Sequence, residues 1–365
     1  MIDDALLSAE TLGGDEFPIT PQPEHLVPNS LAHEQTRSWF RDELESEPGS
    51  VILTRDDTDG YSSAALLVDD IGADTVILPL NPDGAYNFTY ALEDLHATGI
   101  KDTPIYVAGI TLESDEHAGH LEYLTRACDC AVTWYDTARW DDEVVDAFEA
   151  NGVDLVLDSD ECAASLIERE REHEYDENLR EIADLAADLT LERHDDARSD
   201  RLAAFQTMAD TALFIRTVRI HGVDFPPKIN EEVDAQLEHE RHLEADAVDA
   251  ADETIVGDYD VAIAYTRADR RKRIGSALLN EHDNDLAVVL GTDANMGIYS
   301  HSDRETIAKC DEIAAEFGGG GRPTAAECSV PVETFRELAA YWSTTGESIT
   351  DDLVAAIETV VDSSS

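Results

Sequence analysis

Six consecutive residues, Arg55-Asp56-Asp57-Thr58-Asp59-Gly60, place three carboxylates directly after a short apolar run. If that run is a strand of a parallel sheet, the carboxylates lie at the edge of the sheet where α/β proteins bind ligands. Asp57 and Asp59 could then hold a hard divalent cation, which prefers oxygen ligands. The simpler interpretation is that both aspartates cap the following helix and favour its dipole. The local pattern leaves both interpretations open.

Two later segments could bind a phosphate group. The glycines of Gly318–Gly321 would let backbone N–H groups approach an anion closely, and Arg322 follows them directly. The alternative is a flexible loop between a helix and a strand. The second segment has five of the 25 basic residues within seven positions, namely Arg267, Arg270, Arg271, Lys272 and Arg273. Such a cluster predicts phosphate contacts without base recognition, or else ion pairs with a neighbouring acidic helix.

The elements that position these residues follow from the apolar pattern. Short apolar runs bounded by turn residues predict strands over 51–54, 75–80, 105–108, 131–135 and 153–157. Helical periods lie between them over 62–71, 86–96 and 141–150, and each ends near a glycine, which suits the positive φ of a helix C-cap. Because strand and helix alternate, the sequence predicts an α/β domain with a doubly wound parallel sheet.

The rest of the chain predicts further parts. Residues 196–252 are rich in helical patterns and predict a helical connector, and residues 253–343 predict a smaller α/β domain. Its expected strands are 261–265, 286–290, 297–300 and 328–332, with helices near 270–280 and 304–317. With the first domain at 31–195, we expect a mobile acidic, proline-containing arm over 1–30 and a C-terminal tail over 344–365.

The charge is extreme: 81 Asp and Glu against 25 Lys and Arg give a net charge of −56. Molar salt shortens the Debye length to about 3 Å and screens such self-repulsion, so we expect a halophilic cytoplasm. The apolar runs are far shorter than the roughly 20 residues of a membrane span, and the first residues lack a signal-peptide pattern. We therefore expect a cytoplasmic protein without contact to a membrane.

Cysteine and histidine patterns do not predict a metal centre. The five cysteines contain no C-x-x-C pair, so they suggest neither a disulfide framework nor a zinc knuckle, and we expect most of them to be buried. His239 and His242 are expected to be ordinary helix-surface residues.

The segment Arg55–Gly60 resembles the first motif of the DHH phosphoesterase superfamily, His-x-Asp-x-Asp-Gly, to which RecJ-like nucleases belong. Residues 105–109 resemble the third strand of the family, which ends in a metal-binding Asp in active members. Residues 132–141 resemble the Asp-His-His motif with its flanking Trp-Asp, and Asp188 matches the fourth motif. Residues 317–326 resemble the GGGH-x-x-AA signature of the DHHA1 domain. The resemblance spans about residues 50–340 and implies a DHH-like domain followed by a DHHA1-like domain.

The departures from the family pattern concern the metal ligands. An active member would hold two Mn²⁺ or Mg²⁺ ions that activate a water for attack on a phosphodiester. The resemblance places Arg55, Gly109, Thr137 and Ala138 at ligand positions, so the remaining metal ligands, if any, are Asp57, Asp59, Asp136 and Asp188. Glycine and alanine offer no ligand, and arginine repels a cation but could pair with Asp57 or Asp136. We therefore expect a catalytically degenerate site and no cofactor.

The sequence thus predicts a RecJ-like protein that binds single-stranded DNA or RNA and acts with protein partners as a subunit in DNA replication or repair. The resemblance favours nucleic-acid contacts at Gly318–Gly321 and Arg322, and the local reversal of charge adds the basic cluster at 267–273. Arg322 replaces the usual His and keeps a phosphate-binding group that does not titrate.

Two alternative functions are compatible with the same residues. One is a Mn²⁺-dependent single-strand exonuclease or small-nucleotide phosphoesterase with a site made only of carboxylates, from Asp56, Asp57, Asp59, Asp136 and Asp188. The other is a protein–protein interaction module whose ancestral site is vestigial.

Overall fold

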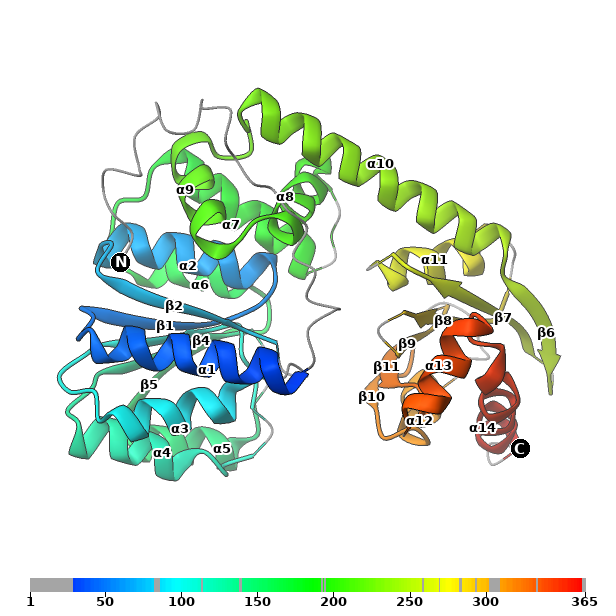
Figure 1. The fold of residues 1–365 in the computed structure, drawn as a ribbon, viewed down its shortest axis with the longest axis horizontal. Helices are drawn as coiled ribbons and strands as arrows, with labels where there is room; N and C mark the ends of the chain where they lie inside the picture. The colour runs from blue at the N-terminus through cyan, green and yellow to red at the C-terminus, as the bar shows by residue number, and fades with distance from the viewer. Residues whose placement is uncertain are drawn as a thin grey trace. The chain divides into compact units, whose positions relative to one another are not determined.

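The computed structural model describes residues 29–362 apart from 82–85, 113, 138–139, 192, 194, 258, 269, 282–283, 293, 302–308 and 333. The chain divides into two compact units (Figure 1). Unit 1 ends at Asp234 and unit 2 begins at Ala235, a division that falls within the long helix α10 (Pro227–Asp249).

Unit 1 is built on a five-stranded sheet in which every pairing is parallel. Its strands are β1 (Ser50–Arg55), β2 (Thr75–Leu80), β3 (Ile105–Ala108), β4 (Val132–Asp136) and β5 (Val153–Leu157). The spatial order is β2-β1-β3-β4-β5, so the direction of winding reverses between β1 and β3. The doubly wound parallel sheet is confirmed, and ligands of such sheets bind where the order reverses.

Helices cover both faces of this sheet (Figure 1). They are α1 (Asn29–Glu45), α2 (Thr58–Ile71), α3 (Phe88–Thr98), α4 (Ala118–Glu122) with a π-helical turn over Tyr123–Ala127, α5 (Asp142–Ala150), α6 (Ala163–Glu170), α7 (Glu177–Thr190), α8 (Ala197–Met208) and α9 (Thr211–His221). Val51 and Leu53 belong to the apolar cluster of α1, α3 and α5. Because strand side chains alternate, Ile52 points to the opposite face.

Unit 2 contains a six-stranded mixed sheet in the order β10-β11-β9-β8-β7-β6. The strands are β6 (Asp252–Val256), β7 (Tyr259–Thr266), β8 (Leu286–Gly291), β9 (Asn295–Ser300), β10 (Gly320–Arg322) and β11 (Ala325–Ser329). β7 and β8 are parallel, and the other neighbours are antiparallel. Its helices are the end of α10, α11 (Arg271–Glu281), α12 (Cys310–Ala315), α13 (Phe335–Ser343), the 3₁₀ turn η5 (Glu347–Ile349) and α14 (Thr350–Asp362). This smaller α/β unit confirms the expected fold class.

Several elements differ from the sequence expectation. α2 begins at Thr58 rather than near residue 62, because Asp57 caps it. The strand expected over 328–332 is β11, displaced toward the N-terminus so that Ala326 and Cys328 enter the core. The helix expected over 304–317 is described only as α12. Of the arm expected over 1–30, residues 1–28 lie outside the described residues and the last two begin α1.

The segment expected as a tail contains α14, whose Leu353, Ile357 and Val360 join the apolar cluster of unit 2. Of the expected connector, α8, α9 and the beginning of α10 fall in unit 1. The domain boundaries given above stay predictions.

Two smaller expectations can be compared with the structure. All five cysteines are buried and free of disulfide bonds. Among the helices that the structure describes, none is long and apolar enough to cross a membrane.

Candidate functional site

The carboxyl ends of three neighbouring strands meet at one edge of the unit 1 sheet. The register pairs Thr54 of β1 with Ala108 of β3, and Ala108 with Tyr135 of β4. Arg55, Gly109 and Asp136, the residues that follow these three positions, therefore lie at the same edge. This is also where the strand order reverses, so the structure brings the first three predicted motifs together.

Asp57 has two local partners. Its Oδ1 accepts the Gly60 backbone N–H at 2.8 Å and caps α2, and its Oδ2 lies 2.9 Å from the Arg55 Nε. A Cβ added to Gly60 would lie 1.9 Å from the Arg55 carbonyl oxygen, so only glycine lets α2 start this close to β1. The neighbouring Asp56 is exposed, and its backbone N–H donates to the Leu80 carbonyl at 3.0 Å.

Asp59 is buried, and its carboxylate binds the N-terminus of α6. Oδ2 accepts the Ala163 N–H at 3.0 Å, and Oδ1 accepts the Ala164 N–H at 2.9 Å. Burial, followed by the charge of Asp57, raises the pKa of Asp59 to about 6, although the two N–H donors oppose this shift. Asp59 thus joins the first turns of α2 and α6.

Asp136 is also buried and accepts three hydrogen bonds. Oδ1 accepts the Thr137 backbone N–H at 2.8 Å, and Oδ2 accepts the Thr111 hydroxyl at 2.8 Å and the Trp140 indole N–H at 2.7 Å. Trp140 itself packs edge-on against Trp134. Thr111 lies outside the motifs that the sequence indicates, and Trp140 belongs to the segment 132–141. Their hydrogen bonds engage both oxygens of Asp136.

Asp188 lies on α7 and is buried. Its Oδ1 accepts the Asp195 N–H at 2.8 Å, and its Oδ2 lies 3.5 Å from the Asp196 nitrogen. The carboxylate therefore holds the backbone at Asp195 and Asp196, directly before α8.

These carboxylates do not fit a pair of divalent cations. Among the described residues, no three His, Cys, Asp or Glu side chains are arranged to hold a metal ion. Gly109 faces this cluster, because an added Cβ would lie 3.5 Å from the Arg55 Cβ and 3.8 Å from the Asp59 Oδ2, yet it supplies no ligand. Thr137 offers its backbone N–H to Asp136, and Ala138 lies outside the described residues.

Arg55 lies at the surface of the site. Its side chain is 55% exposed, and that of Asp57 is 36% exposed. An ion pair this accessible to water contributes about 0 to 1 kcal/mol. Of the two expected partners, the structure pairs Arg55 with Asp57, while the oxygens of Asp136 are bound by other donors.

In unit 2, three of the four glycines in the run Gly318–Gly321 are required by the fold. A Cβ on Gly319 would lie 2.3 Å from the Cys328 Cβ, and one on Gly321 would lie 2.6 Å from the Ala325 carbonyl oxygen. Gly318 has a φ of 74°, in the left-handed region that glycine favours. Gly320 has neither restriction, since its φ is not positive and an added Cβ would have no neighbour within 4 Å.

The register of the unit 2 sheet brings the basic cluster and the glycine run to the same end. Thr266 of β7 pairs with Gly291 of β8, and Arg267 follows directly. Met296 of β9 pairs with both Leu290 of β8 and Cys328 of β11, and Gly319 packs on Cys328. The end of β7, the β8–β9 turn and the start of the glycine run therefore share one end of the sheet. Four strand spacings, about 19 Å, separate β7 from β10.

The basic residues differ in position and in partners. Arg322 pairs with Ala325, and Ala325 pairs with Tyr299 of β9. Tyr299 lies level with Ala287 of β8, so Arg322 lies toward the other end of the sheet from Arg267. Arg267 and Arg322 are exposed and form no ion pair with a described residue. Arg270, Arg271, Lys272 and Arg273, at the start of α11, take part in interactions with other groups.

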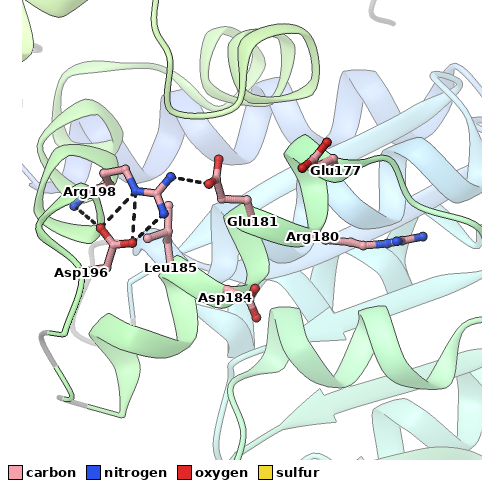
Figure 2. A pocket seen from close by; sticks show the side chains of 7 residues that line it. All are labelled: Glu177, Arg180, Glu181, Asp184, Leu185, Asp196 and Arg198. Carbon is pink, nitrogen blue, oxygen red and sulfur yellow. Dashed lines mark hydrogen bonds and ion pairs between the residues drawn. The ribbon is translucent and has the colours of Figure 1, made fainter.

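A hollow of about 560 Å³ lies elsewhere in unit 1, on α7 and the start of α8 (Figure 2). Arg198 binds both Asp196 and Glu181 there, at an exposed surface. On α10, the Nδ1 of His242 lies 2.8 Å from the Glu238 carbonyl oxygen. Neither feature shares a residue with the predicted sites.

Comparison with known proteins shows a likeness in fold. No protein-family model matches the sequence, and no curated protein matches it. The structure is similar to the exonuclease RecJ bound to manganese, with a TM-score of 0.51 and 12% identity over 91% of this chain and 95% of that chain. It is also similar to the DHH domain of a protein described as a member of a ribosomal-protein family, with a TM-score of 0.53 and 11% identity over 96% of both chains.

Proposed function

Because the chain has the fold of the DHH/RecJ-like superfamily, we propose that it is a catalytically degenerate member that binds single-stranded nucleic acid through unit 2. In this proposal it acts as a non-hydrolytic subunit in DNA replication or repair. The subunit role rests on the fold alone, whereas the loss of catalysis and the binding surface rest on particular residues.

The observation that carries the proposal is the way in which the carboxylates of unit 1 are bound. Asp59 holds two backbone N–H groups, and Asp136 holds three donors. A carboxylate has about four acceptor positions, so these hydrogen bonds take two of them on Asp59 and three on Asp136 and orient both side chains toward donors of the protein. The carboxylates therefore serve the fold at the positions where the family pattern places metal ligands.

The helix N-termini support the same conclusion. The first turns of α2 and α6 point to this sheet edge, and helix N-termini attract anions such as phosphate. Here Asp57 occupies the first turn of α2, and Asp59 occupies that of α6. Two internal carboxylates thus take the place that substrate anions would need.

Unit 2 presents exposed positive charge in place of buried carboxylates. Arg267 and Arg322 present guanidinium groups without a described ion-pair partner, and the start of the glycine run lies at the same end of the sheet as Arg267. A guanidinium matches the geometry of a phosphate, and glycine lets a backbone approach closely. The expected ligand is the phosphate backbone of a single strand.

The experiment measures binding of a fluorescent oligonucleotide to the full chain across a KCl series. Arg267→Gln and Arg322→Ala should each weaken binding and flatten the salt dependence by about 0.7 in log–log slope for each phosphate that the variant no longer binds. Arg126→Gln is the matched control, since Arg126 is an exposed arginine on unit 1 that pairs with Glu122. Wild-type affinity and slope in both unit 2 variants would overturn the proposed binding surface.

The exonuclease alternative is tested in the same preparation. We expect no degradation of labelled single strands with Mn²⁺ in molar KCl. Degradation that disappears in Asp57→Ala protein would replace the proposal by a carboxylate-only metal site.

A further inference from the structure

Trp342 is a large apolar side chain that unit 2 leaves in contact with solvent. It lies on α13 and is 46% exposed. Its only polar atom is already bound, because the indole N–H donates to the Thr292 carbonyl oxygen at 2.9 Å. The adjacent Tyr341 donates its hydroxyl to the Gly291 carbonyl at 2.6 Å. These two hydrogen bonds hold α13 on the end of β8 and fix the direction of the indole.

The position of Trp342 relates it to the two phosphate-binding segments. Thr292 begins the β8–β9 turn, which lies at the same end of the sheet as Arg267 and the start of the glycine run. In strand order, this turn lies between β7, which leads to Arg267, and β10, which contains Gly320 and Arg322. A single strand that runs along this end of the sheet, from Arg267 to the start of the glycine run, therefore passes the indole.

We propose that Trp342 is a stacking platform for one unpaired base of the bound strand. This inference rests on the proposed function of unit 2 and adds the group that is recognised there. An aromatic side chain with its edge tied down and part of its surface exposed can stack a base of any identity. A duplex keeps its bases stacked on each other, so Trp342 selects single strands over duplex without reading a sequence.

Base stacking would also maintain binding at high salt, where phosphate contacts are weak. Phosphate contacts weaken steeply as salt rises, and a chain with a net charge of −56 is expected to work in high salt. Stacking does not depend on counterion release and adds affinity that salt does not remove. The basic segments then orient the strand, and Trp342 retains it.

The test compares a fluorescent oligothymidylate with an abasic backbone of the same length, which keeps the phosphates and lacks the bases. Trp342→Ala should weaken binding of the oligothymidylate about 5- to 150-fold, the range that corresponds to one stacked base. It should leave binding of the abasic backbone and the salt slope unchanged. Trp342→Phe keeps an aromatic ring and should retain most of the affinity.

The matched control is Trp39→Ala, because Trp39 is a tryptophan of unit 1 with a similar exposure of 44%. We expect no change in binding from that variant. Thermal melting of all variants shows whether any of them has lost its fold. If Trp342→Ala is unfolded, Trp342→Leu replaces it as the variant without an aromatic ring.

Two results would overturn the inference while leaving the proposed function intact. One is wild-type binding of the oligothymidylate by Trp342→Ala protein while Arg322→Ala binds weakly. The other is an equal loss for the oligothymidylate and the abasic backbone, which would assign Trp342 a structural role or a protein partner. Wild-type binding by the Arg267 and Arg322 variants would instead remove the proposed function, and this inference with it.

Discussion

The carboxyl edge of the unit 1 sheet and the basic end of the unit 2 sheet use their polar groups in opposite ways. At the unit 1 edge, Asp59 and Asp136 are buried and bound to donors of the protein itself. In unit 2, Arg267 at the basic end of the sheet and Arg322 on β10 are exposed and without a described ion-pair partner. A polar group that forms its hydrogen bonds inside the protein contributes to stability, whereas an exposed group without an ion-pair partner is available to a ligand. Substitutions in unit 1 should therefore change stability, and those in unit 2 should change binding.

The largest expected effect concerns Asp136. Replacing it with alanine leaves the Thr111 hydroxyl, the Thr137 N–H and the Trp140 indole N–H without their acceptor. The buried indole N–H left without an acceptor costs about 1 to 3 kcal/mol, and the two more accessible hydrogen bonds contribute about 1 kcal/mol each, so Asp136→Ala should lower the unfolding free energy by about 3 kcal/mol. Urea unfolding in molar KCl measures this, with Asp136→Asn as the conservative variant.

If Asp136 were instead an open metal ligand, its removal would leave stability unchanged or raise it, as often happens when an unpaired buried charge is removed. That outcome would contradict the contrast between the two regions.

A pH-dependent effect of similar size is expected for Asp59. Its pKa is raised from 3.8 to about 6 in the folded protein, so the folded state binds more protons than the unfolded chain between these values. Its contribution to the unfolding free energy therefore falls as pH rises from about 4 to 6, by about 3 kcal/mol at 1.36 kcal/mol per pKa unit. Below pH 4 Asp59 is protonated in the folded protein, so the free-energy cost of burying its charge is absent.

The measurement compares wild type with Asp59→Asn, which cannot titrate. The stability difference, wild type minus variant, should decrease between pH 4 and pH 7 and then stay constant. A difference that increases over this interval would mean that Asp59 is stabilised as a charged group, as a metal ligand or ion-pair partner would be.

The sequence was sufficient for the parts of the fold that carry local signals. The five strands of unit 1 are short apolar runs between turn residues, and Gly60 marks the turn from β1 into α2. β10 was missed because Gly320–Arg322 has no apolar residue, and its place is set by pairing with β11. β6 was missed because Asp252, Glu253 and Ile255 are exposed on this strand at the edge of the sheet.

The hydrogen-bond partners of the carboxylates at the unit 1 edge could not be predicted from the sequence, for a different reason. The motif positions of Asp57, Asp59 and Asp136 follow from the family pattern, but their partners do not. The donors to Asp59 are 104 and 105 residues away in the chain, and Thr111 lies 25 residues from Asp136. No spacing rule connects these residues, since the packing of α6 on α2 and of β3 beside β4 brings them together.

A smaller effect, on binding alone, is expected at Gly320. Because an added Cβ would meet nothing within 4 Å, Gly320→Ala should leave the melting temperature close to that of the wild type. If a phosphate approaches the backbone there, the methyl group interferes with a charge-assisted hydrogen bond and should weaken oligonucleotide binding about tenfold.

Gly319→Ala is the matched control, because its Cβ would clash with the Cys328 Cβ and should destabilise unit 2. Wild-type binding by Gly320→Ala would remove Gly320 from the contact surface and leave Arg322 as the principal contact of β10.

The smallest effect is expected for Arg55, which the family pattern places at a metal-ligand position. Its ion pair with Asp57 is largely open to water, so Arg55→Ala should lower the unfolding free energy by no more than about 1 kcal/mol. Such pairs are screened further in molar KCl, where the change should approach zero. Differential scanning calorimetry at low and high KCl measures both values. A decrease of about 3 kcal/mol or more at high salt, the size expected for breaking a buried pair, would show that Arg55 compensates the buried carboxylates. The unit 1 edge would then depend on a cation after all, supplied by a side chain in place of a metal.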